Sequence, residues 1–159
     1  MVCAYNLLDK YKHLTFSWQR QRCASIVKPL SLGGKAMEIK WIHQSEAPLR
    51  LYGVWGENQK QELVSYWAAA QLEIGFTGSI LLIDAGIQGD IQVSLDGERT
   101  QPVICYGMMN IKAAPGSHSL HITVHSPSRL ALRAMGVEGT EQLLELPKRP
   151  YIHYIGDSI

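Results

Sequence analysis

The sequence predicts a mainly β protein: a jelly-roll β-sandwich followed by a linker and one further strand. Two features predict it. Several short segments carry a hydrophobic residue at every second position, and turn signals separate these segments about every 10 residues. Alternation of this kind is typical of strands with one buried face, and several such strands joined by turns indicate a sandwich or jelly roll. Helical periodicity is sparse.

The first clear strands are expected in residues 71–83. Residues 71–77 alternate hydrophobic with polar or small side chains, which favours a strand with one buried face. Thr77-Gly78 predicts a turn into Ile80–Ile83, a continuous apolar run suited to a strand that is covered on both faces. The preceding residues 58–70 include three consecutive alanines, but their apolar spacing is poor for a helix. We expect strand and loop there.

A hairpin follows. Residues 91–95 alternate again and lead into Asp96-Gly97, a dipeptide that tolerates the positive φ angles of a tight hairpin turn. Val103–Tyr106 is the expected return strand. Pro102, at the start of that segment, is tolerated at the edge of a sheet.

The last strands of the sandwich are expected between residues 117 and 139. Pro115-Gly116 predicts a turn, after which residues 120–125 alternate between aliphatic and polar side chains. Leu130–Val137 is the final strand of this set, and Gly139 ends it.

These features divide the chain into three segments. Residues 1–36 are an N-terminal extension without a clean period, in which residues 2–14 are a candidate short helix and Leu32-Gly33-Gly34 reads as a break. Residues 37–146 form the predicted sandwich. Residues 147–159 comprise a linker, whose two prolines favour extended backbone, and a final β-prone strand.

Composition excludes several classes of protein. The chain has 159 residues, 46% of them hydrophobic and 18% charged, which is ordinary for a globular protein. A net charge of +1 gives no global field for recruiting nucleic acid or an acidic membrane. The sequence has neither a membrane-spanning apolar run nor a signal peptide, so the cytoplasm is the default location. Three cysteines outside any C-x-x-C pair suggest reduced thiols, and we expect no metal and no cofactor.

The sharpest chemical feature is the Gly156-Asp157-Ser158 sequence that follows the apolar residues 151–155. A glycine at the end of a strand permits a tight turn, and a serine that opens a helix lies beside free backbone N–H groups able to bind an oxyanion. The pattern differs from the G-x-S-x-G elbow of the α/β-hydrolases. Its value comes from the strand and the proline-containing linker that precede it.

In its ordered motifs the chain resembles carbohydrate esterase family 2, the acetyl-xylan esterase-like enzymes of the SGNH or GDS type. The resemblance covers about residues 48–159. It rests on Leu51–Trp55 (the family's R-x-x-G-R-W region), Ser65-Tyr66-Trp67, Leu72–Gly78, Val93–Glu98, Pro115–His118 and Gly156-Asp157-Ser158.

The resemblance implies that a jelly-roll domain precedes the first strand of an α/β/α SGNH catalytic domain, truncated here after the GDS block. It places Ser158 at the nucleophile position, with Gly156 and Asp157 completing the motif. The substrate of such a parent enzyme would be an acetylated carbohydrate. The late histidine that activates the serine, and most of the oxyanion hole, would lie in the missing SGNH domain. We therefore expect this chain alone to be inactive, because a serine is a poor nucleophile without a base.

Three interpretations stay open at this point. The chain is a fragment of a deacetylase, a stand-alone carbohydrate-binding sandwich whose GDS motif is a relic, or one part of an enzyme to which a second polypeptide supplies the histidine. Calorimetry with xylo-oligosaccharides separates the second interpretation from the first, and co-purification of an esterase subunit would support the third.

The histidines of this chain are poor substitutes for the absent base. His153 would lie about 16 Å from Ser158 along an extended strand. His121 and His125 share a strand face about 13 Å apart, too far to chelate one ion, and His118 is expected in a turn. We expect these last three on the solvent face at an edge of the sandwich.

The chain has four tryptophans, which invite a sugar-stacking hypothesis. Isolated tryptophans near strands are more often core or domain-interface residues, and we favour that interpretation for all of them. They are Trp18, Trp41, Trp55 and Trp67.

Overall fold

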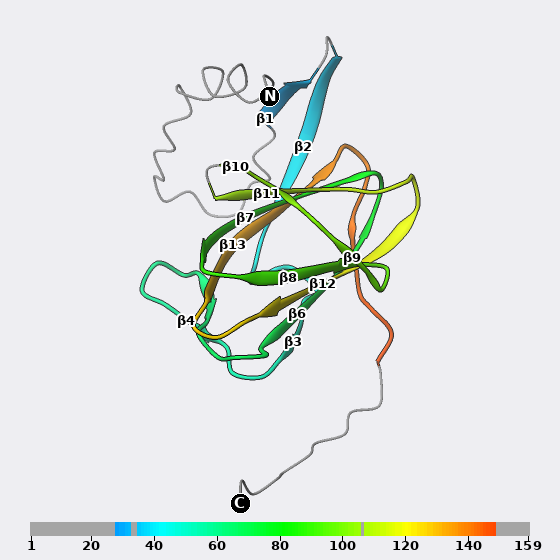
Figure 1. The fold of residues 1–159 in the computed structure, drawn as a ribbon. Helices are drawn as coiled ribbons and strands as arrows, with labels where there is room; N and C mark the ends of the chain where they lie inside the picture. The colour runs from blue at the N-terminus through cyan, green and yellow to red at the C-terminus, as the bar shows by residue number, and fades with distance from the viewer. Residues whose placement is uncertain (1–27, 33–34, 106, 149–159) are drawn as a thin grey trace, which may run out of the picture.

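The computed structural model describes residues 28–32, 35–105 and 107–148, with side chains of strand residues described from Glu38 onward except Cys105. In this part of the chain two antiparallel β-sheets pack face to face, and no residue is helical (Figure 1). The mainly β sandwich predicted from alternation and turn signals is therefore confirmed.

The larger sheet has eight strands among the described residues. Its main path is β1 (Lys28–Leu32), β2 (Lys35–His43), β13 (Arg129–Glu138), β7 (Ile80–Gln88), β11 (Met108–Lys112) and β10 (Val103–Cys105). The long strand β13 has β7 on one side and two partners on the other. These are β2 and the short β5 (Leu63–Ser65), which in turn pairs with β4 (Gly56–Glu57).

The smaller sheet has six strands in the same described ranges. Its path is β14 (Leu143–Leu144), β6 (Gln71–Thr77), β12 (Ser117–Val124), β8 (Ile91–Leu95) and β9 (Glu98–Thr100). Strand β6 shares its outer edge between β14 and β3 (Arg50–Tyr52).

The connectivity is that of a jelly roll. From β6 to β8 the chain changes sheet at every strand, and it does so again from β11 to β13. The long strands β2 and β13, at opposite ends of the sandwich sequence, lie next to each other, with Glu138 opposite Ile39 and Ala134 opposite His43. This return of the last long strand to the first brings the two ends of the sandwich sequence together in one sheet.

The core lies between the sheets and follows the predicted alternation. In β12, Leu120, Ile122 and Val124 are fully buried, while the residues between them are only partly covered. They pack against apolar side chains of the opposite sheet such as Leu81 and Ile83 of β7. Each fully buried side chain of this size contributes about 1.5–3 kcal/mol.

Strand β6 departs from the expected pattern of one buried face. Besides its core residues, Glu73 is only 3% exposed and Gly75 is buried too. Both lie on the side that faces away from the core. Arg50 of β3 and the segment around Leu144 and Leu146 cover them.

The hairpin at Asp96-Gly97 is confirmed, but the predicted return strand is wrong. Leu95 pairs with Glu98, and the two turn residues have φ angles of 52° and 86°, as a type I′ turn requires. The two-residue turn makes β9 the return strand. After Pro102, Val103–Cys105 pairs with β11 in the other sheet, where Val103 and Ile104 are 61% and 55% exposed.

Residues 58–70 contain a turn, β5 and a loop, as expected. The candidate helix at residues 2–14 and the β-prone residues 151–155 lie outside the described residues. The segment boundary at residue 37 falls within β2, which forms a hairpin with β1 that projects beyond the sandwich (Figure 1).

Gly136 of β13 provides a test of how tightly β13 packs against β2. A Cβ atom at this position would lie 2.7 Å from Cγ2 of the buried Ile39 and 3.3 Å from the Trp41 ring. We expect Gly136→Ala to lower the free energy of unfolding by about 1–3 kcal/mol, because it overpacks a rigid site. Urea denaturation measures this loss.

Gly56→Ala is the matched control, since no atom lies within 4 Å of its added Cβ. Its effect should stay within about 0.5 kcal/mol. Equal losses in the two variants would contradict the packing shown for β13.

Candidate functional site

The predicted motif Gly156-Asp157-Ser158 lies outside the described residues, as does His153. The described part of the chain ends at Lys148, just after β14 and Leu146-Pro147. A candidate site lies on the smaller sheet, whose strand β3 contacts this end of the sandwich through Arg50.

The segment Arg50–Trp55 is an R-x-x-G-x-W sequence that makes a tight corner after β3. Gly53 has a φ of +85°, and a Cβ there would lie 3.1 Å from the Cα of Ala70, so the close approach needs glycine. The Trp55 indole N–H donates to the carbonyl of Tyr52 at 2.9 Å, and the ring packs against the core. The corner fixes the position of β3, and with it Arg50.

A row of three charged or titratable side chains crosses the outer face of the smaller sheet. Arg50 Nη1 donates to Glu73 Oε2 at 2.9 Å, and His121 Nδ1 lies 3.2 Å from Glu73 Oε1. The three residues occupy directly paired positions on β3, β6 and β12. The Glu73 side chain is 4% exposed, so its charge is stabilised by these neighbours rather than by water.

Beside this row the sheet carries an open polar groove of about 450 Å³. Its lining is dominated by hydroxyl, amide, carboxylate and imidazole groups. These come from Gln71, Ser94, Asp96, Gly97, Ser119, His121 and Thr123.

His118 is not a turn residue on a solvent-exposed edge, so that expectation is wrong. It lies in β12, an interior strand, with its side chain 11% exposed and its ring 5.2 Å from Phe76. Its Nδ1 is 2.7 Å from Asp96 Oδ2 and its Nε2 is 2.6 Å from the Ala114 carbonyl. Both ring nitrogens face acceptors, which favours the doubly protonated, charged ring.

This pairing shifts both titrating groups. The hydrogen bond to Asp96 raises the pKa of His118 above its ordinary 6.5, with help from the Ala114 carbonyl and against the effect of burial. The hydrogen bonds from His118 and from the Ser119 backbone lower the pKa of Asp96 below its ordinary 3.8. The pair connects the β8–β9 turn to the start of β12.

His121 and His125, which the sequence placed with His118, lie in different surroundings. His121 has a side chain 25% exposed and paired with Glu73, whereas His125 follows the end of β12 and is exposed. Within the described ranges, no group of three or more His, Cys, Asp or Glu side chains is arranged to hold a metal ion.

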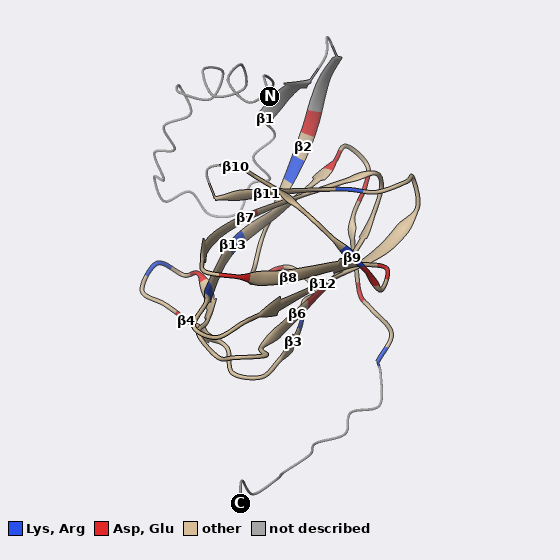
Figure 2. Cartoon of the chain, viewed as in Figure 1, with Lys and Arg blue, Asp and Glu red and all other residues tan. Residues whose placement is uncertain are grey.

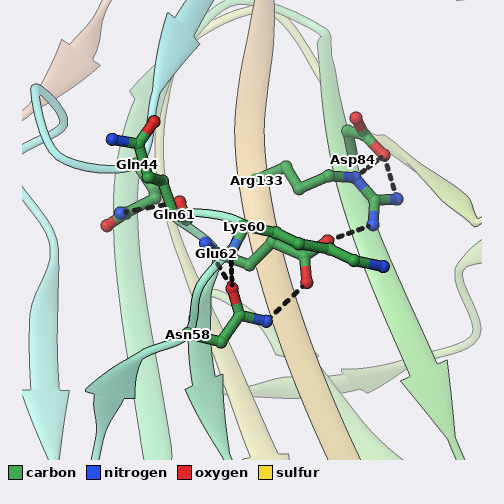
Figure 3. Close-up of polar contacts among 7 residues, drawn as sticks. All are labelled: Gln44, Asn58, Lys60, Gln61, Glu62, Asp84 and Arg133. Atoms are coloured by element: carbon green, nitrogen blue, oxygen red, sulfur yellow. Dashed lines mark hydrogen bonds and ion pairs between the residues drawn. The ribbon is translucent and has the colours of Figure 1, made fainter.

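A second polar cluster lies on the outer face of the larger sheet (Figure 3). The bulge in β13 between Leu132 and Ala134 places Arg133 between two carboxylates. Its Nε is 2.9 Å from Asp84 Oδ1 and its Nη1 is 2.9 Å from Glu62 Oε1, while Asn58 donates to Glu62 Oε2 at 2.7 Å. Burial works to raise the pKa of Glu62, but the hydrogen bonds from Asn58 and Arg133 outweigh it and the pKa is lowered. Both carboxylates are therefore engaged in hydrogen bonds within the cluster.

The aromatic residues separate into buried and exposed groups. Trp55 packs against the core and Trp41 is half-buried, consistent with the structural role expected for them. Trp67 is 60% exposed and its neighbour Tyr66 is 66% exposed, so Trp67 is not a core residue of this sandwich. The Arg129 guanidinium lies 5.0 Å from the centre of the Tyr66 ring. Trp18 is outside the described residues.

Charged residues are spread along the described strands and loops, with basic and acidic positions interspersed (Figure 2). No membrane-spanning helix is present in the ranges that the structure covers.

Known structures share this fold at low sequence identity. A family two carbohydrate esterase from Cellvibrio japonicus matches with a TM-score of 0.57 and 18% identity, over 72% of this chain and 37% of that one. A family two carbohydrate esterase from Clostridium thermocellum, in complex with cellohexaose, matches with a TM-score of 0.50 and 19% identity, over 63% and 34% of the two chains. A salicylyl-acyltransferase from a tetracycline biosynthetic pathway matches with a TM-score of 0.55 and 9% identity, over 70% and 42%.

No protein-family model and no curated protein sequence matches the chain. At these identities the structural matches establish a shared β-sandwich fold. The chain matches between a third and about two-fifths of the length of each of these three proteins.

The His118–Asp96 pair predicts a pH-dependent stability. A raised histidine pKa stabilises the fold fully below 6.5 and less as the pH rises through the raised value. A lowered aspartate pKa stabilises it above 3.8 and less as the pH falls through the lowered value. The stability difference between native protein and His118→Gln should therefore be greatest between pH 3.8 and pH 6.5. Its size should be only about 1 kcal/mol, because the Asp96 side chain is half exposed to solvent. Denaturant titrations across the pH range measure this difference.

His125→Gln is the control, since His125 is exposed at the end of the same strand. A stability difference for His118→Gln that stays constant from pH 5 to pH 9 would contradict the charged pair.

Proposed function

We propose that residues 37–146 are the accessory β-sandwich of a serine-dependent carbohydrate acetyl esterase, whose catalytic part starts at Gly156-Asp157-Ser158. The observation that carries the proposal is the order of segments along the chain. A sandwich that shares its fold with known carbohydrate esterases leads, through a proline-containing linker, to an apolar segment and a GDS motif. The fold supports the first half of this order and the motif resemblance supports the second.

The proposed reaction removes an acetyl group from a carbohydrate in two steps. The Ser158 hydroxyl attacks the acetyl carbonyl carbon and passes its proton to a base, while backbone N–H groups stabilise the oxyanion. The sugar oxygen leaves with that proton, and an acetyl-serine results. Water then attacks the acetyl-serine, and acetate leaves with Ser158 restored.

The base for this reaction is proposed to come from the SGNH domain. Two histidines of the sandwich are poor alternatives, because His118 is engaged by Asp96 and Ala114 and His121 pairs with Glu73. The salicylyl-acyltransferase that shares the fold indicates that such a sandwich accompanies more than one kind of acyl chemistry. We therefore assign the acetylated-carbohydrate substrate to the catalytic part and not to the sandwich.

The proposal predicts that the purified 159-residue chain does not turn over p-nitrophenyl acetate above the spontaneous rate. On this proposal the activating base belongs to the SGNH domain, and losing the base alone removes nearly all of a triad's contribution to catalysis. The measurement is steady-state hydrolysis by the native chain and by Ser158→Ala. Turnover that Ser158→Ala abolishes would show that the chain is active alone.

Sequencing the DNA downstream of Ile159 tests the parent activity directly. A continuation, in frame or shifted, that encodes a late Asp-x-x-His segment supports the esterase. A natural stop codon with no such segment contradicts it.

A second candidate function is carbohydrate binding without catalysis. The specific observation in its favour is the adjacent, exposed pair Tyr66 and Trp67, because exposed aromatic rings give the apolar face of a sugar a surface to stack on. Their loop is hydrogen-bonded to the end of β12 through Ala69, Ala70 and Val124.

This candidate predicts a measurable affinity for xylohexaose or cellohexaose that Trp67→Ala reduces about tenfold, since the substitution removes the stacking surface. Isothermal titration calorimetry measures the change. Val103→Ala is the matched control, because Val103 is equally exposed on the larger sheet. An absence of binding by the native protein would contradict the candidate.

A further inference from the structure

We propose that Arg50 is a positioning residue, which clamps the end of the sandwich and fixes the path of the chain at Leu146 and Pro147. The guanidinium joins three segments that are far apart in sequence. It lies on β3, pairs with Glu73 of β6 and donates through Nη2 to the backbone carbonyls of Leu146 and Pro147.

The contacts suit a clamp because they hold backbone, not side chains. Leu146 and Pro147 keep these bonds whatever direction their own side chains take, so the bonds define where the main chain runs. Arginine is well suited to this role, since its planar fork presents several donors in a fixed geometry. The Arg50 side chain is 19% exposed and its partner Glu73 is 4% exposed, so the ion pair that holds the guanidinium in place is largely shielded from water.

Glu73 orients the guanidinium. One of its carboxylate oxygens accepts from Arg50 and the other faces His121 Nδ1. The acceptor for Arg50 is therefore fixed from both sides on the interior strands of the sheet. Arg50 itself lies on β3, and its carboxylate partner and the neighbouring histidine lie on β6 and β12.

The steric fit at Gly75 supports the same path. A Cβ at Gly75 would lie 2.7 Å from the Leu144 carbonyl oxygen and 2.9 Å from Leu146 Cδ2. Residues 144–146 therefore lie directly on β6, at a position that only glycine allows. Together, Gly75 and Arg50 hold residues 144–147 against β6 and β3.

The functional part of this inference rests on the proposed function: a fixed exit would set the orientation of a following catalytic part relative to the sandwich. The clamp itself is testable without any activity. Its failure and the failure of the esterase proposal are thus separate results.

Proteolysis after lysine tests the clamp. Lys148 follows the two clamped carbonyls, and a protease must draw the residues before its cleavage site into an extended conformation. We expect Arg50→Gln to raise the rate of cleavage after Lys148 about tenfold in limited digestion by a lysine-specific endoprotease, because charge-assisted hydrogen bonds that restrain local opening are lost. Mass spectrometry of the products assigns each cut to its site.

The exposed Lys60, in the turn before β5, is the internal control. Global destabilisation would accelerate cleavage after Lys60 and Lys148 alike, whereas release of the clamp accelerates only the latter. Arg129→Gln is the matched control variant, since Arg129 is a partly buried arginine that contacts Tyr66. Its cleavage after Lys148 should equal that of the native protein.

Gly75→Ala supplies a second test that leaves every charge in place. It should also raise cleavage after Lys148 selectively, because the added methyl displaces residues 144–146. An Arg50→Gln protein whose Lys148 is cut at the native rate, or whose Lys148 and Lys60 accelerate equally, would overturn the proposal.

Discussion

Burial of apolar side chains between the two sheets is the interaction on which the other features depend. Leu72, Ile74 and Phe76 of β6 and their counterparts on β12 face the interior side chains of β7 and β13. Because side chains alternate along a strand, fixing these residues inward also fixes which polar residues face outward. Glu73 and His121 reach the outer face of the smaller sheet for this reason, and Arg50 meets them there through the pairing of β3 with β6.

The outer faces therefore carry the chemistry that differs between the sheets. On the larger sheet, Arg133 lies between Asp84 and Glu62 and completes a closed set of ion pairs (Figure 3). On the smaller sheet, the row from Arg50 to His121 borders an open groove and contacts the end of the sandwich. The row on the smaller sheet thus binds the backbone at the end of the sandwich, whereas the Arg133 cluster on the larger sheet does not contact it.

Sequence patterns predicted the parts of this structure that depend on local chemistry. Alternation identified the cores of β6, β8 and β12, and Asp96-Gly97 identified the hairpin turn, because both signals arise from neighbouring residues. The patterns failed where contacts with distant segments determine sheet membership or burial. Val103–Cys105 joins the other sheet, Glu73 is buried by residues more than 20 positions away, and His118 belongs to a strand because Ser117 pairs with Thr77. The R-x-x-G-x-W sequence could have pointed to Arg50, its first residue. No sequence pattern pointed to the partners of Arg50, which are Glu73 and the carbonyls of Leu146 and Pro147. Ser158 stays a prediction from resemblance.

The pairing of β2 with β13 also has a consequence for how the protein folds. These strands are separated by most of the sandwich sequence, so the larger sheet is incomplete until residues 134–138 meet residues 39–43. Contacts between such distant residues form slowly, because a long loop must close before the contacts compensate for its lost entropy. On the ribosome, the earlier strands would emerge with their apolar faces uncovered and would stay so until β13 is synthesised. The interval before closure is when this chain is most exposed to misfolding and aggregation.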